Sequence, residues 1–100
     1  MRLGQVIGRV VLSTRPESFR GGRWLIASPL DAQDMLKGMP TEPRVSAQAS
    51  LVVYDDLGAG IGDVIGIVEG AEAMAPFDHP MPIDAISVAI FDTICYQPPG

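Results

Sequence analysis

A glycine-rich segment bounded by acidic residues is the part of the sequence that most invites a chemical interpretation. The segment Gly58–Gly62 reads GAGIG, with Asp55 and Asp56 before it and Asp63 after it. Loops that hold a dinucleotide have the spacing G-x-G-x-x-G and open a helix, whereas here Asp63 takes the last glycine position and an apolar strand follows. The flanking carboxylates would also repel phosphates. The segment is therefore interpreted as a tight link between two strands, in which glycine permits a positive φ or close approach to a neighbouring chain.

Other reactive side chains do not form a catalytic or metal-binding set. Asp55 and Asp56 are neighbours in a predicted strand and point to opposite faces, so they are not an acid/base pair. Cys95 lies in an apolar stretch far from the single histidine, His79, and a buried structural thiol is predicted. One cysteine and one histidine do not make a structural zinc site, and one cysteine fits a reducing cytoplasm. We expect no catalytic residue, no cofactor and no metal.

The composition indicates a folded domain that associates with copies of itself. The chain has 100 residues, of which 47% are hydrophobic and 19% charged. This is far from the composition of disordered proteins, and one domain accounts for the length. A protein surface with few charged side chains is commonly buried against other copies of the same chain. An obligate oligomer is therefore expected.

Charge is distributed unevenly along the chain, whose net charge is −5. Residues 1–44 carry all seven basic residues and four acids, a balance of +3, whereas residues 45–100 carry eight acids and no Lys or Arg. Either the two halves lie on different faces and copies meet head to tail, or they interleave in one sheet and neutralise each other. The acidic balance disfavours nucleic acid as a partner.

Frequent Gly and Pro residues, 20 in all, and short apolar runs predict an all-β fold. In the stretch Arg44–Asp55, alternate residues from Val45 to Val53 are apolar and share one face of a long strand. Helical turns are expected over Ala32–Leu36 and where Asp84 follows Pro82. The predicted strands are Arg2–Ser13, Trp24–Leu30, Arg44–Asp55, Asp63–Glu69 and Ile83–Tyr96.

Five strands without a long helix favour a small OB-like barrel, because closing the sheet on itself removes its edges. We expect a single domain over residues 1–96 and an exposed, proline-containing tail over 97–100. No apolar run approaches the roughly 18 residues needed to cross a bilayer, so no membrane association is expected.

The acidic and glycine-rich residues also carry a family resemblance. The pattern D-x-x-G-A-G-x-G-D-V resembles the signature of the EutN/CcmL family of bacterial microcompartment vertex proteins. Other stretches resemble that family in order along the chain: Leu3–Gly8, Ser13–Arg15, Gly22–Leu25 and Pro82–Ala85. The signature residues here are Asp55, Gly58, Ala59, Gly60, Gly62 and Asp63.

This resemblance implies an OB-like barrel that assembles as a cyclic homopentamer. Such pentamers occupy the vertices of a polyhedral protein shell in the bacterial cytoplasm, which hexameric shell proteins otherwise tile. The implied role is structural, and the signature loop becomes a candidate subunit interface or pore loop.

Three other functions are compatible with a small barrel of this kind. A ring that binds a partner or small ligand outside any shell is the closest alternative. Single-stranded nucleic-acid binding, known for OB-like barrels, ranks lower because the chain has few aromatic residues and an acidic half. A small enzyme ranks lowest, for want of a nucleophile, base and orienting group.

Overall fold

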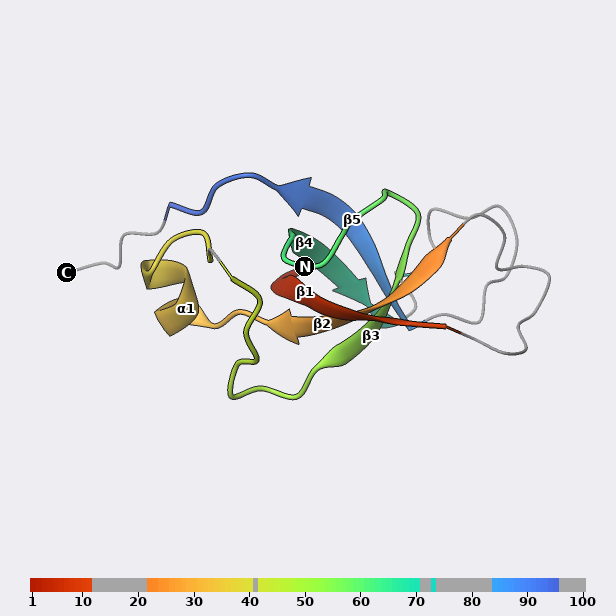
Figure 1. The fold of residues 1–100 in the computed structure, drawn as a ribbon, viewed down its shortest axis with the longest axis horizontal. Helices are drawn as coiled ribbons and strands as arrows, with labels where there is room; N and C mark the ends of the chain where they lie inside the picture. Colours follow the sequence, from red (N-terminus) through yellow and green to blue (C-terminus); the bar gives the residue numbers. More distant parts are fainter. Residues whose placement is uncertain (12–21, 41, 71–72, 74–83, 96–100) are drawn as a thin grey trace.

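The described residues form a closed barrel of five strands and one short α-helix. The computed structural model describes residues 1–11, 22–40, 42–70, 73 and 84–95. The order of elements is β1 (Arg2–Val10), β2 (Arg23–Pro29), α1 (Ala32–Leu36), β3 (Leu51–Asp55), β4 (Val64–Glu69) and β5 (Ala85–Phe91). The predicted five-stranded, all-β barrel is confirmed, as is the helical turn over Ala32–Leu36 (Figure 1).

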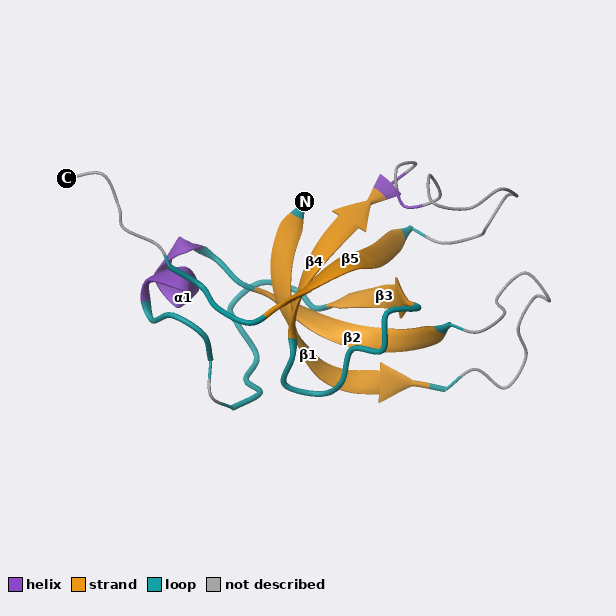
Figure 2. Cartoon of the chain, turned by 90° about the horizontal axis from the view of Figure 1, so that it is seen from above, coloured by secondary structure: helices purple, strands orange, loops and turns teal. Residues whose placement is uncertain are grey.

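The barrel closes in the order β1-β2-β3-β5-β4, with β4 returning to β1 (Figure 2). The long strand β1 makes closure possible because its first residues pair with β4 and Gly4–Val10 pairs with β2. A register shift between Val6 and Gly8 interrupts the pairing of β1 with β2. All neighbouring strands are antiparallel except β3 and β5, which are joined in parallel at Tyr54 and Ile86.

The inner face of the sheet and part of its outer face are packed, so the apolar pattern of several strands is nearly continuous. The main core fills the barrel and consists of Val6, Leu25, Ala27, Val53, Ala59, Ile65, Ile67 and Ala85. A second cluster contains Tyr54, Ala73 and Ile86, with Trp24 and Val68 packed against it. The Trp24 and Tyr54 rings meet edge to face, with centroids 5.4 Å apart. Residues on alternate faces of β3 therefore belong to different clusters, as the two-residue period of a strand requires.

The long strand predicted over Arg44–Asp55 is wrong for its first half. Only Leu51–Asp55 is a strand, and Val45 in the supposed buried face is 69% exposed. The preceding segment crosses the outside of the barrel and bonds to side chains rather than to a neighbouring strand. The Arg44 N–H donates to Gln5 Oε1 (3.3 Å), and the Ser46 N–H donates to Ser28 Oγ (2.8 Å). These side chains replace a β ladder as the partners of the backbone.

The last strand is shorter than predicted at both ends. It begins at Ala85, directly after Asp84, so the helical turn expected at Asp84 is wrong. The Asp84 carbonyl instead accepts a hydrogen bond from the Gly70 N–H (2.8 Å). Cys95 is exposed rather than buried, because β5 ends at Phe91 and the chain has already left the barrel. The expected Ser13–Arg15 turn, His79 and the 97–100 tail lie outside the described residues.

The basic and acidic halves of the chain interleave in one barrel. Basic β1 pairs with acidic β4, and β2 pairs with β3. Ion pairs join Arg2 to Glu69 (3.2 Å) and Arg23 to Asp55 (3.9 Å). Of the two charge arrangements considered, the described strands therefore adopt internal neutralisation. Within the described part of the chain, no helix has the length and hydropathy to span a membrane.

Candidate functional site

Asp55 organises the glycine-rich loop that joins β3 to β4. Its side chain is completely buried, and its Oδ2 accepts hydrogen bonds from the backbone N–H groups of Gly58 and Ala59, both at 3.0 Å. The Ser87 hydroxyl on β5 donates to the other oxygen, Oδ1. Arg23 donates to the Ala59 carbonyl (3.1 Å) while its Nη2 lies 3.9 Å from Asp55 Oδ2. The carboxylate thus ties the loop to three strands.

The backbone conformation requires glycine at two of the three glycine positions of the loop. Gly58 and Gly62 have φ values of +90° and +97°, a region that residues with a side chain rarely adopt. Gly60 has no positive φ, and a Cβ there would meet only Asp63 Oδ2, at 3.8 Å. Its N–H donates to that same oxygen (2.8 Å). The protomer therefore requires glycine at positions 58 and 62 but not at position 60.

Gln5 attaches the far end of the loop to β1 and to the crossing segment. Its side chain is fully buried. Its Nε2 donates to the carbonyls of Glu42 and Gly62, both at 3.2 Å, and its Oε1 accepts from the Arg44 N–H. The main chain continues the link, because the Gly62 N–H donates to the Val6 carbonyl (2.8 Å). One amide side chain therefore joins three segments of the chain.

This arrangement is structural rather than reactive. The acceptor oxygens of Asp55 are occupied by backbone N–H and hydroxyl donors, and Asp63 binds the Gly60 N–H. Asp56 is exposed on the other face, as the strand period predicts. No group of three or more His, Cys, Asp or Glu side chains that could hold a metal ion occurs among the described residues. All six signature residues lie in or beside one loop.

The signature loop and the barrel around it match a known family. The family model described as "Ethanolamine utilisation protein EutN/carboxysome" matches residues 1–92. This chain belongs to the EutN/CcmL family. The resemblance inferred from the signature residues is thereby confirmed.

Relatives within the EutN/CcmL family match nearly the whole chain. The microcompartment shell vertex protein GrpN of Rhodospirillum rubrum is 34% identical over 96 residues, covering 94% of this chain and 96% of GrpN. The carboxysome shell vertex protein CcmL of Synechococcus elongatus is 30% identical, covering 94% and 86%.

Solved structures of the EutN/CcmL family share the fold. The pentameric GrpN structure from R. rubrum aligns with a TM-score of 0.76 at 30% identity, covering 97% of this chain and all of that chain. The EutN structure from Escherichia coli aligns with a TM-score of 0.75 at 25% identity, covering 96% and 89%.

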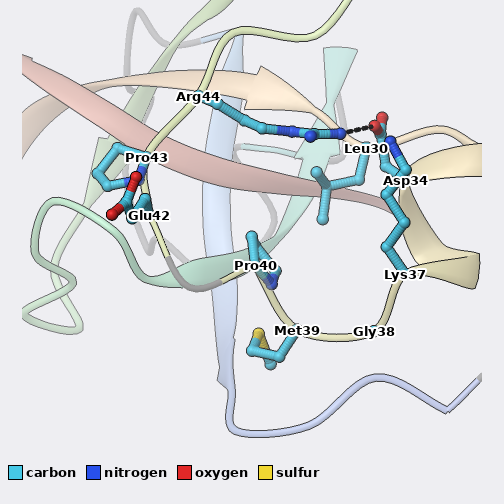
Figure 3. A pocket seen from close by; sticks show the side chains of 9 residues that line it. All are labelled: Leu30, Asp34, Lys37, Gly38, Met39, Pro40, Glu42, Pro43 and Arg44. Atoms are coloured by element: carbon cyan, nitrogen blue, oxygen red, sulfur yellow. Dashed lines mark hydrogen bonds and ion pairs between the residues drawn. The ribbon is translucent and has the colours of Figure 1, made fainter.

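A second feature of this EutN/CcmL chain is a hollow of about 350 Å³ beside α1. Figure 3 shows Arg44 directed toward Asp34 at its edge, joined by an ion pair of 3.0 Å. Asp31 and Asp34 also cap α1 reciprocally through their side chains and backbone N–H groups. The Asp31 N–H, and then Arg44, hold the pKa of Asp34 below its usual 3.8, although partial burial acts in the opposite direction. The hollow is lined by Leu30, Asp34, Lys37, Gly38, Met39, Pro40, Glu42, Pro43 and Arg44.

Sequence reasoning identified the loop and Asp55 but missed the other residues that hold the loop. Ser87 and Arg23 come from distant strands, and nothing in the local pattern marks them. Gln5 did carry a signal, since it is an amide inside an otherwise apolar run of β1. A buried amide of this kind needs hydrogen-bond partners, and the structure places them at positions 42, 44 and 62.

Proposed function

We propose that five copies of this chain form a ring that closes a vertex of a bacterial microcompartment shell. The chain is a shell protein of the EutN/CcmL family, and the curated relatives are shell vertex proteins. The observation that carries the proposal is the full-length likeness to a pentameric shell protein, at 30% identity and a TM-score of 0.76. Its location is therefore the shell of a compartment within the bacterial cytoplasm.

The signature loop is the proposed contact between neighbouring subunits, near the five-fold axis. Two large apolar side chains of this loop are exposed in the protomer, Leu57 at 48% and Ile61 at 64%. Between them Gly60 has no neighbour in its own chain that would exclude a side chain. Exposed apolar groups around a glycine that the protomer does not require support close approach of a second copy.

The outer rim of the ring would contact hexameric shell proteins. A flat lattice of hexagonal tiles has no intrinsic curvature, so a closed polyhedron needs five-fold positions, which a ring with closed cyclic symmetry supplies. The segment 31–43, with α1 and the half-buried Met39 and Pro40, is one proposed contact. The second, Gly70–Pro82, lies largely outside the described residues. Such contacts are individually weak and gain strength by repetition across the shell.

We further propose that the ring has no catalytic role. The relatives are named as shell vertex proteins. In the described residues, the Asp55 carboxylate accepts loop hydrogen bonds, and the Asp34 carboxylate accepts the Asp31 N–H of the helix cap and pairs with Arg44. Removal of the protein should therefore leave the encapsulated enzymes active in a cell lysate.

Replacing Gly60 with valine is expected to disrupt the ring while preserving the barrel. The native ring of five 10.6 kDa chains has a mass of about 53 kDa, measurable by light scattering or native mass spectrometry. Because position 60 has no positive φ and open space around it, the unfolding free energy of the protomer should change by only about 0.5 kcal/mol. Species smaller than the ring should appear at micromolar protein concentration.

Ala32→Val is the matched control, because it adds bulk at an exposed position on α1, at the other end of the molecule from the end of β3 (Figure 1). This variant should assemble normally. Unchanged assembly of Gly60→Val would mean that the loop faces solvent in the ring. A wild-type protein that stays monomeric or dimeric would contradict the ring itself.

Deleting the gene in cells that produce the companion shell proteins is expected to leave tubes, sheets or leaky particles. Electron microscopy of purified particles checks the shape, and enzyme assays on the lysate check the cargo. Closed shells together with the loss of a soluble enzymatic step would contradict the proposed role. Supplying the chain from a plasmid is the control and should restore closed particles.

A further inference from the structure

A second, smaller hollow lies where the end of β1 and the start of β2 meet the signature loop. It measures about 250 Å³ and is lined by Arg9, Arg23, Leu25, Ala59, Gly60 and Ile61. The sheet register brings its two arginines to the same face. Arg9 is paired with Leu25, a residue of the main core, and Arg23 is paired with the buried Asp55. Both residues therefore lie on the inner face of the sheet at this open end of the barrel, where both are exposed.

Both arginines have hydrogen-bond donors that no described residue uses. Arg23 uses Nη2 for the Ala59 carbonyl (3.1 Å), with Asp55 Oδ2 at 3.9 Å. Asp55 is already stabilised by two backbone N–H groups and a hydroxyl, so Arg23 is not its main partner. Arg9 makes no hydrogen bond or ion pair with the described part of the chain. A guanidinium has five N–H donors, so the described residues occupy only a small part of the donor capacity of this pair.

We propose that this hollow binds a small oxyanion, a carboxylate or phosphate group of few atoms, between Arg9 and Arg23. Planar guanidinium groups bind such anions through paired, charge-assisted hydrogen bonds. Leu25 and Ala59, which are 2% and 1% exposed, form an apolar floor that limits hydration of the bound anion. A volume of about 250 Å³ admits a small carboxylate or phosphate rather than a nucleotide. The lining residues come from one barrel, but Gly60 and Ile61 also belong to the proposed subunit contact, so in the ring the bound anion would lie beside that contact.

Titration of the assembled protein with inorganic phosphate, at constant ionic strength, tests the proposal. The side-chain N–H signals of Arg9 and Arg23 in nitrogen-15 NMR spectra should shift together and saturate, with a Kd on the order of 1 mM. Arg9→Gln should weaken binding roughly tenfold or more, because it removes one charged partner of the anion. Arg44→Gln is the matched control, since Arg44 is paired with Asp34, and it should leave the affinity unchanged. Circular dichroism should show the same strand content in all three proteins.

Two results would overturn the proposal. The first is no saturable shift at about 20 mM phosphate, well above the expected Kd. The second is that Arg9→Gln binds phosphate as tightly as the wild type, which would mean that the anion binds elsewhere. Saturable binding to a protein that proves monomeric would support the anion site and contradict the vertex role.

Discussion

Asp55→Ala is expected to lower the free energy of unfolding by about 3–5 kcal/mol, because buried donors lose their common acceptor. The buried Ala59 N–H and Ser87 hydroxyl would have no partner in their place, and the Gly58 N–H would turn to solvent. Domains of this size are stable by only about 5–15 kcal/mol. Thermal unfolding should therefore shift downward by on the order of 15 °C.

Urea unfolding measures this loss. Wild type and variant are compared at the same protein concentration, because the apparent stability of an oligomer depends on concentration. Asp55→Asn is the matched control because it keeps the shape and one acceptor oxygen for the two loop N–H groups, while its amide can donate to Ser87. It should recover much of the lost stability. Equal destabilisation by the two variants would show that the charge, through Arg23, matters more than the hydrogen bonds. A change below about 1 kcal/mol in Asp55→Ala would contradict the assigned role of Asp55.

Gln5→Ala is expected to lower the free energy of unfolding by about 2–3 kcal/mol, somewhat less than Asp55→Ala. It removes both donors to the Glu42 and Gly62 carbonyls and the acceptor for the Arg44 N–H. The crossing segment and the loop then lose their shared attachment to β1. Besides lower stability, faster amide hydrogen exchange is expected at Arg44.

Gln5→Glu distinguishes the hydrogen bonds from the volume of the side chain. It nearly preserves the shape, but at pH 7 it would direct a carboxylate oxygen at the carbonyls of Glu42 and Gly62. The two variants should therefore be destabilised to a similar extent, or the glutamate variant more. Near-native stability of Gln5→Glu would show that packing at Gln5, rather than its amide donors, holds the segments together.

Local pattern predicted much of the fold because strands and turns depend on neighbouring residues. The two-residue apolar period and the glycine and proline positions predicted five strands, the helical turn over Ala32–Leu36 and the loop between β3 and β4. The same reasoning failed over residues 44–50. The alternation of apolar residues there continues into β3, but a strand also needs a neighbouring strand to pair with. The backbone N–H groups of this segment instead donate to the side chains of Gln5 and Ser28.

For the signature loop, too, the sequence predicted one part of the structure and not another. A glycine-rich turn was apparent from its composition, yet the positive φ at Gly58 and Gly62, and its absence at Gly60, follow from how the loop is anchored at both ends. Cys95 was expected in the core because it follows an apolar run, but the length of β5 is limited by its pairing with β4, which ends at Phe91.

The sequence by itself determined the all-β class, the position of the signature loop and the family to which they belong. Only the tertiary structure decided which residues hold the loop and which arginines share a hollow. Ser87 is 32 residues from Asp55, and Gln5 is 57 residues from Gly62. Such partners meet because the register of the whole closed sheet brings them together, and that register reflects the packing of every strand rather than any local pattern.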